Sequence, residues 1–163
     1  MHYYFNQPIN TNTVNELVEK LTDEEQINLW FSTTGGDIDS MFFLLDFLDT
    51  IKDKLVITLS SRVCSIGTLL LTDFKGKLEI NPDYYFTLFH KIDCDYDSQR
   101  KTEPNSKMII SYMKRDNAAL LKKYVDKGIL NPEQAKKFEE GEDVVLYRDD
   151  MMKLPMFAKK NQP

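Results

Sequence analysis

Apolar residues recur at helical spacing soon after the start of the chain, and this spacing predicts the first helix. Thr13 and Glu16 form a capping-box pattern in front of the apolar series, so we expect the helix to begin there. The apolar positions of this helix are Val14, Leu17, Val18 and Leu21. Residues 2–5 before it can form a short strand. The chain therefore opens with a predicted strand and an amphipathic helix.

A strand, a helix and a second strand are predicted over residues 27–60. Residues 27–33 are largely apolar and end in the turn Thr34-Gly35-Gly36. From Asp37, the expected N-cap, to about Lys52, apolar residues surround most of the helix, so we expect it to be covered on two sides. Residues 55–60 read as a buried strand, and a helix between two strands of one sheet makes them parallel. This unit predicts the α/β class.

Shorter elements are predicted in the rest of the chain. A short apolar helix over residues 65–74 is followed by strands over 78–80 and 84–89. Two more helices follow, the first amphipathic over about 105–127 and ending at Gly128, the second capped by Asn131 with Pro132 in its first turn. A weak strand is predicted over residues 144–147.

Composition narrows the class of protein. The 163 residues are 42% hydrophobic, enough for one core, so we expect a single domain over residues 1–163. The net charge of −5, from 21 basic and 26 acidic residues spread along the chain, leaves no basic stripe, and nucleic acid is not an expected partner. Cys64 and Cys94 cannot make a disulfide framework. With no signal-like start and no apolar run longer than residues 41–45, we expect a cytoplasmic protein without a membrane partner.

Ser65 and His90 are the first candidates for catalysis. The only other histidine, His2, lies at the terminus, whereas His90 closes a predicted strand, where sheet enzymes present catalytic side chains. Ser65 begins a helix after a buried strand, and free backbone N–H groups there favour a developing oxyanion. Its surroundings are not the GxSxG pattern. From the residues alone, a helix cap for Ser65 and a backbone-bonded imidazole for His90 remain alternatives.

Two further patterns concern ligands. Gly35 and Gly36 follow a strand and open a helix, so their backbone N–H groups can point at a reacting oxygen, although a simple tight turn is the alternative. Neither a dinucleotide-binding nor a P-loop pattern is present. Aspartates alternate after His90 as in a calcium loop, but Ser98 and Pro104 occupy the positions that need glycine and glutamate. A solvated acidic edge is therefore preferred, and we expect no metal and no cofactor. The aspartates are Asp93, Asp95 and Asp97.

The order and spacing of these segments resemble the ClpP family of the crotonase-like superfamily over roughly residues 3–154. Residues 31–37 (FSTTGGD) resemble the family's strand end and glycine turn, I-N-S-P-G-G. Residues 63–71 (VCSIGTLLL) look like its nucleophile segment, A-A-S-M-G-A-x-L-L, and residues 75–77 (KGK) resemble K-G-K-R. Further along, residues 81–90 stand where the family has its P-N-S…M-I-H strand. Residues 141–146 (GEDVVL) resemble the segment that supplies the triad aspartate.

The resemblance implies a ClpP/crotonase-like fold of repeated ββα units with a protruding handle helix in the region of about residues 105–140. It also implies a serine endopeptidase that works through an acyl-enzyme, with Ser65 as nucleophile, His90 as general base and Asp143 as the residue that orients the histidine. The residues alone would not prefer Asp143 to the aspartates at 149 and 150. The expected oxyanion donors are the backbone N–H groups of Ile66 and of the glycine turn at 35–36.

The resemblance also implies partners. Family members act on peptides or unfolded proteins and assemble into rings, so a homo-oligomer is expected. The family docks an AAA+ ATPase through a segment before the first strand, and this chain begins almost at that strand, so an ATPase is only a secondary expectation. After His90 the family has Gln-Pro and a glycine-containing strand that pairs with substrate, whereas this chain has residues 91–97 (KIDCDYD) without glycine, which predicts altered pairing.

Three competing hypotheses follow from the same residues. The altered segment after His90 favours a catalytically impaired scaffold or binding subunit with a ClpP-like fold. A crotonase-like acyl-CoA enzyme shares the fold and the backbone oxyanion hole but does not need Ser65. Cys64 could be the nucleophile instead of its neighbour, although adjacent residues point in different directions and the resemblance selects Ser65.

Overall fold

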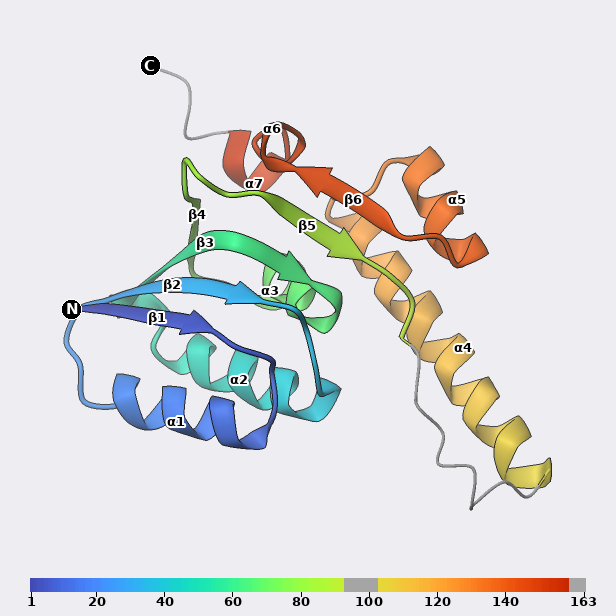
Figure 1. Cartoon of the computed structure of the whole chain (residues 1–163), viewed down its shortest axis with the longest axis horizontal. Coiled ribbons are helices and arrows are strands. Elements are labelled where there is room, and N and C mark those ends of the chain that lie inside the picture. Colours follow the sequence, from blue (N-terminus) through green and yellow to red (C-terminus); the bar gives the residue numbers. More distant parts are fainter. Residues whose placement is uncertain (93–102, 159–163) are drawn as a thin grey trace. The chain divides into compact units, whose positions relative to one another are not determined.

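The computed structural model describes residues 1–92 and 103–158. Six strands in these ranges form a mostly parallel sheet (Figure 1). The strands lie in the order β1-β2-β3-β5-β6, and β4 pairs with β3 beside this path. Strand β3 pairs in parallel with β2, β4 and β5, and β1 pairs in parallel with β2. The strands are β1 (His2–Asn6), β2 (Ile27–Thr33), β3 (Leu55–Cys64), β4 (Lys77–Ile80), β5 (Phe86–Phe89) and β6 (Val144–Tyr147). The predicted α/β class is confirmed.

Helices connect the strands of this sheet. Their bounds are α1 (Thr11–Leu21), α2 (Ile38–Thr50), α3 (Leu69–Asp73), α4 (Glu103–Asp126), α5 (Pro132–Glu140), α6 (Arg148–Met151) and α7 (Pro155–Ala158), with short 3-10 helices η1 (Lys52–Lys54) and η2 (Ser65–Thr68). The predicted caps of α2 and α5 are confirmed, because Asp37 accepts a bond from the Ser40 N–H and Asn131 from the Gln134 N–H.

The chain forms two compact units. The first consists of residues 1–89 and the chain from residue 145 onward, and the second of residues 90–144. The first unit therefore holds β1 to β5 and β6 from its second residue, with α1, α2, α3, α6 and α7, and the second holds α4 and α5. The expectation of a single domain over residues 1–163 stays a prediction.

The core of the first unit lies between the sheet and the helices α1 and α2, which lie on the same side of β1, β2 and β3 in Figure 1. Alternate residues of β2 and β3 are buried, as the period of two in a strand requires. Phe5 of β1 stacks on Phe31 of β2, with ring centroids 5.1 Å apart. The helices contribute buried aliphatic residues, among them Val14, Leu17, Leu21, Met41, Leu44 and Leu48.

Two predictions about the first helices are wrong in detail. The cap of α1 is Asn10, whose side chain accepts from the backbone N–H groups of residues 12 and 13, and Thr13 returns the bond as the third residue of the helix. Helix α2 is also not covered on two sides, because Phe42 and Phe43 remain 42% and 51% exposed. A pattern of apolar residues shows which positions could be buried, but it does not supply a partner for each face.

Strand β3 is longer than predicted and contains an irregularity near its end. Phe31 of β2 pairs with Leu59 of β3, but the next pair is Thr33 with Val63. Between these pairs β2 advances by two residues and β3 by four, so β3 carries two extra residues. Ser61 within the added stretch has a φ of 58°. Beyond this irregularity β3 continues to Cys64, directly before the candidate nucleophile.

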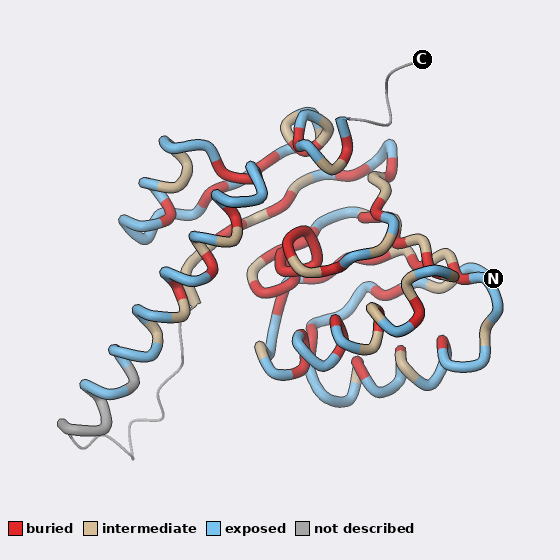
Figure 2. The backbone as a smooth tube through the Cα atoms, turned by 180° about the vertical axis from the view of Figure 1, so that it is seen from behind, coloured by how far each residue is buried: buried red, intermediate tan, exposed pale blue. Residues whose placement is uncertain are grey.

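The second unit has its own small core between α4 and α5. Tyr124 of α4 and Phe138 of α5 are nearly fully buried and meet edge to face, with ring centroids 5.8 Å apart. The chain turns between these helices at Gly128, which has a φ of 65°. Buried residues gather toward the end of α4, and much of its described earlier part is exposed (Figure 2).

Candidate active site

Ser65 lies at the first position of η2, immediately after β3. It is partly exposed, while the residues on either side of it are buried. Its φ of 55° places it in the left-handed region, which a residue with a side chain seldom adopts. A strained serine between a strand and a helical turn is an arrangement in which a nucleophile is presented to substrate, so the backbone outlier itself points to function.

Gly35 comes against Ser65 within the same unit. A Cβ atom on Gly35 would lie 2.5 Å from Ser65 Cβ and 3.0 Å from Ser65 Oγ. It would also lie 3.1 Å from the carbonyl oxygen of Cys64, and the φ of Gly35 is 100°. Only glycine fits such a close approach with such a backbone conformation. The structure therefore brings the predicted glycine turn and the predicted nucleophile together.

The glycine turn is held by the segment that follows β1. The Ile9 N–H donates to the Gly35 carbonyl, and the Asp37 N–H donates to the Ile9 carbonyl, both at 2.8 Å. A Cβ on Gly36 would lie 2.0 Å from the Ile9 carbonyl oxygen, so the second glycine is required by this contact. The turn is thus fixed on one side by Ile9 and faces Ser65 on the other through Gly35.

The two glycines differ as oxyanion donors. The Gly35 N–H donates to the hydroxyl oxygen of Thr33 at 3.0 Å. Gly36 is exposed, and among the described residues its N–H has no hydrogen-bond acceptor. Ile66 stands in the first turn of η2, where backbone N–H groups have no acceptor within the helix. Of the three donors expected from the sequence, the Gly35 N–H is therefore occupied within the described residues, and the N–H groups of Gly36 and Ile66 remain candidates.

Cys64 is poorly suited to be the nucleophile in place of Ser65. It is a buried free thiol with 8% of its surface exposed. Burial raises the pKa of Cys64, and the nearby Arg62 lowers it only in part. Because the thiolate is the reactive form, a raised pKa makes the thiol less nucleophilic at neutral pH.

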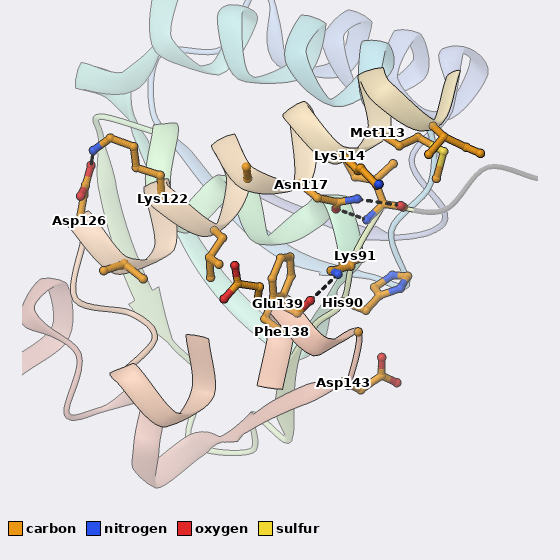
Figure 3. A pocket seen from close by; sticks show the side chains of 16 residues that line it. His90, Lys91, Met113, Lys114, Asn117, Lys122, Asp126, Phe138, Glu139 and Asp143 are labelled. Atoms are coloured by element: carbon orange, nitrogen blue, oxygen red, sulfur yellow. Dashed lines mark hydrogen bonds and ion pairs between the residues drawn. The ribbon is translucent and has the colours of Figure 1, made fainter. Parts of the chain in front are cut away.

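His90 and Asp143 belong to the second unit and line one pocket there. The pocket has a volume of about 780 Å³ and lies along α4 and the end of α5 (Figure 3). Its apolar part includes Leu121 and Phe138. His90 is partly exposed and Asp143 is exposed, and no hydrogen bond among the described residues joins the two side chains. The roles of His90 as base and Asp143 as orienting residue stay predictions.

The chain that follows His90 is attached to both helices of this unit. The Ile92 N–H donates to Asn117 Oδ1 at 2.6 Å, and Asn117 Nδ2 donates to the Ile92 carbonyl at 3.1 Å (Figure 3). Lys91 Nζ donates to the carbonyl of Glu139, near the end of α5, at 2.5 Å. Three hydrogen bonds therefore hold the two residues directly after His90.

The described part of the chain contains neither a candidate metal site nor a candidate membrane span. Within residues 1–92 and 103–158, no cluster of three histidine, cysteine, aspartate or glutamate side chains could hold a metal ion. No helix in the same ranges is long and apolar enough to cross a membrane. The aspartates at 93, 95 and 97, Cys94 and most of the acidic segment after His90 lie outside the described residues.

Sequence reasoning missed two residues that hold the candidate segments, Thr33 in the first unit and Asn117 in the second. Thr33 is buried, bonds the Gly35 N–H, and donates its own hydrogen to the Gln7 carbonyl at 2.9 Å. A threonine two residues before a glycine turn can bond the turn's backbone, so a signal for Thr33 was present. Asn117 is an amide on an amphipathic helix, and only the fold reveals its partner.

Comparison with known proteins gives one family. Residues 2–77 match the family model for Clp protease, a range that covers β1 to the first residue of β4 and includes Ser65 and the glycine turn. No curated protein matches this chain. The matched segment, which is slightly less than half of the chain, and the mixed α/β fold with its mostly parallel sheet agree, and together they support a ClpP-like family for this chain.

Proposed function

We propose that this chain is a serine endopeptidase subunit in which Ser65 is the nucleophile. The observation that carries the proposal is the approach of Gly35 to the Ser65 side chain, with a Cβ at Gly35 only 3.0 Å from Oγ. A reacting carbonyl next to Oγ would therefore also lie next to the glycine turn. The Clp protease family, which is a family of peptidases, supplies the reaction class.

In the proposed reaction, Ser65 Oγ attacks the carbonyl carbon of a peptide bond and His90 accepts the hydroxyl proton. The carbonyl oxygen becomes an oxyanion, which the N–H groups of Gly36 and Ile66 would stabilise; one such donor is worth about 3–4 kcal/mol of barrier. His90 then gives its proton to the departing amine, which leaves an acyl group on Ser65. Water, deprotonated by His90, hydrolyses this ester and restores the serine.

Chain connectivity supports His90 as the base. Strands β3 and β5 are parallel neighbours, and Cys64 pairs with Leu88 near their carboxyl ends. The chain reaches Ser65 one residue after this pair on β3 and His90 two residues after it on β5. Asp143 comes one residue before β6, the strand that neighbours β5 in the sheet. Ser65 and His90 thus follow the carboxyl ends of two neighbouring parallel strands, which is where α/β enzymes place their sites, whereas Asp143 precedes its strand.

A fluorophosphonate probe tests the proposal directly, because it reacts covalently only with an activated serine. The intact protein should be labelled at Ser65, as located by peptide mass spectrometry. Ser65→Ala and His90→Ala should abolish labelling, whereas Cys64→Ala should keep it. Failure of the folded protein to be labelled, together with no cleavage of unfolded protein substrates, would refute the peptidase assignment.

A catalytically impaired scaffold is the second candidate, and one observation favours it. The Gly35 N–H is occupied by the Thr33 hydroxyl, so one of the predicted oxyanion donors is not free in this conformation. A scaffold should bind unfolded peptides without being labelled by the probe. We also propose that the subunit forms a homo-oligomer, as Clp protease family members do, and native mass spectrometry of the full chain would measure the number of subunits.

A further inference from the structure

Two hydrogen bonds of opposite direction join the side chain of Asn117 to the backbone of Ile92. The amide oxygen of Asn117 accepts the Ile92 N–H, and its amide nitrogen donates to the Ile92 carbonyl, so one side chain satisfies both backbone groups of one residue (Figure 3). This is the pattern by which neighbouring strands bond each other's backbones. The side chain of an α4 residue therefore takes the place of a strand for the segment after β5.

Asn117 is buried, so the loss of its hydrogen bonds would cost free energy. Only 9% of its surface is exposed, although asparagine is a poor helix former and is seldom buried. A buried amide must have its hydrogen-bond partners, and Ile92 supplies an acceptor for its N–H₂ group and a donor for its oxygen. Substitution of Asn117 would leave the backbone groups of Ile92 without these partners.

We propose that Asn117 is a positioning residue for His90. It acts through the backbone of Ile92, which is two residues from His90, and Lys91 adds a second attachment through the Glu139 carbonyl. Residues 90–92 are thereby held against α4 and the end of α5, along the pocket that His90 and Asp143 line. This inference rests on the proposed peptidase function, because the position of His90 matters for catalysis only if His90 is the general base.

The hydrogen bonds between Asn117 and Ile92 depend on a residue at which this chain differs from the family pattern. In the family pattern that the sequence resembles, proline follows the residue after the histidine, and Ile92 occupies that position here. Proline has no backbone N–H, so it could not donate the 2.6 Å bond to Asn117 Oδ1. Ile92→Pro therefore removes the donor while leaving Asn117 itself unchanged, and it gives an independent test of the same contact.

The experiment compares labelling rates of variants in the full chain. Asn117→Leu keeps the branched shape of the side chain without its hydrogen bonds, and Asn117→Asp keeps an acceptor for the Ile92 N–H but places a carboxylate against the Ile92 carbonyl. Leu120→Ala is the control, because Leu120 is buried on the same helix and does not line the pocket. All rates are divided by the folded fraction, so that loss of stability alone is removed from the comparison.

We expect Asn117→Leu and Ile92→Pro to slow fluorophosphonate labelling of Ser65 by about tenfold to hundredfold, the range for a small misplacement of a catalytic group. The loss should fall on kcat rather than KM in peptide cleavage, and Asn117→Asp should lie between Asn117→Leu and the natural protein. Leu120→Ala should label within about twofold of the natural rate. Equal rates for Asn117→Leu and Leu120→Ala would overturn the positioning role.

A measurement that needs no activity separates this inference from the proposed function. In the natural protein the Ile92 amide should exchange slowly with solvent, and in Asn117→Leu it should exchange at least about tenfold faster, with the His90 imidazole resonances displaced. If natural protein is not labelled at all, the peptidase assignment fails and these spectra still decide whether Asn117 positions His90. Unchanged Ile92 exchange and His90 resonances in Asn117→Leu would refute it.

Discussion

Replacement of Gly35 by alanine tests whether the glycine turn and the nucleophile touch as the structure requires. The new Cβ would lie 2.5 Å from Ser65 Cβ and 3.1 Å from the Cys64 carbonyl oxygen, both closer than unstrained contacts allow. Ser65 is itself held at a φ of 55°, so it has little freedom to move away. We therefore expect Gly35→Ala to lower both stability and reactivity.

The expected loss of stability in Gly35→Ala has two parts, and a second glycine, Gly141, allows them to be separated. Alanine at a left-handed φ costs about 1–2 kcal/mol, and forcing an extra methyl group into a packed site adds about 1–3 kcal/mol. Gly141 has a φ of 90°, close to the 100° of Gly35, but a Cβ there would have no atom within 4 Å. Gly141→Ala should therefore lower the free energy of unfolding by about 1–2 kcal/mol, and Gly35→Ala by about 2–5 kcal/mol.

The assay is urea denaturation of both variants, followed by fluorophosphonate labelling of Gly35→Ala below its transition. We expect the labelling rate of folded Gly35→Ala to fall by about a hundredfold or more, because a displaced Ser65 loses its geometry relative to the oxyanion donors. If Gly35→Ala were no less stable than Gly141→Ala and were labelled at the natural rate, the contact between Gly35 and Ser65 would be wrong.

Three further predictions concern groups near the site. Thr33→Val removes the hydrogen-bond partner of the Gly35 N–H and of the Gln7 carbonyl. It should lower the free energy of unfolding, measured by urea denaturation, by about 1–3 kcal/mol. Hydrogen bonds from Ser40 lower the pKa of Asp37, so its capping contribution of about 0.5–2 kcal/mol should be present above about pH 4 and disappear as pH falls through the lowered pKa. Stability of Asp37→Ala and natural protein should therefore converge in acid, and a constant difference down to pH 2 would contradict this. In Cys94→Ser protein, Cys64 should react with iodoacetamide slowly when folded, faster as pH rises, and rapidly in urea, because burial raises its pKa.

Much of the local structure could be predicted because it follows from short-range patterns. Strand β2 has the predicted bounds, and the parallel pairing of β2 with β3 followed from the helix between them. The cap of α1 was missed because Thr13 and Glu16 have the capping-box spacing, whereas the chain enters the helix at Asn10, an equally suitable cap. The end of β3 was missed because its last part is polar and does not alternate.

Only part of the candidate site could be predicted from the sequence. Ser65 and Gly35 are far apart in the sequence, and neither pattern alone indicated that a Cβ on one would strike the other. Their pairing came from the family resemblance, and the contact inside the first unit supports it. Asn117 could not be predicted, because a hydrogen bond between an amide and a backbone segment 25 residues away leaves no periodic signal.

The two extra residues of β3 lie between two regular pairs, Phe31 with Leu59 and Thr33 with Val63. Over the same length of sheet β2 uses two residues and β3 uses four, so the extra residues add backbone without moving Val63 along the sheet. Deletion of two residues from the stretch 60–62 would therefore allow both pairs to remain, and it would remove the stretch in which Ser61 takes its φ of 58°. This short polar stretch thus lets the backbone ahead of Ser65 vary while the core of the first unit keeps its packing.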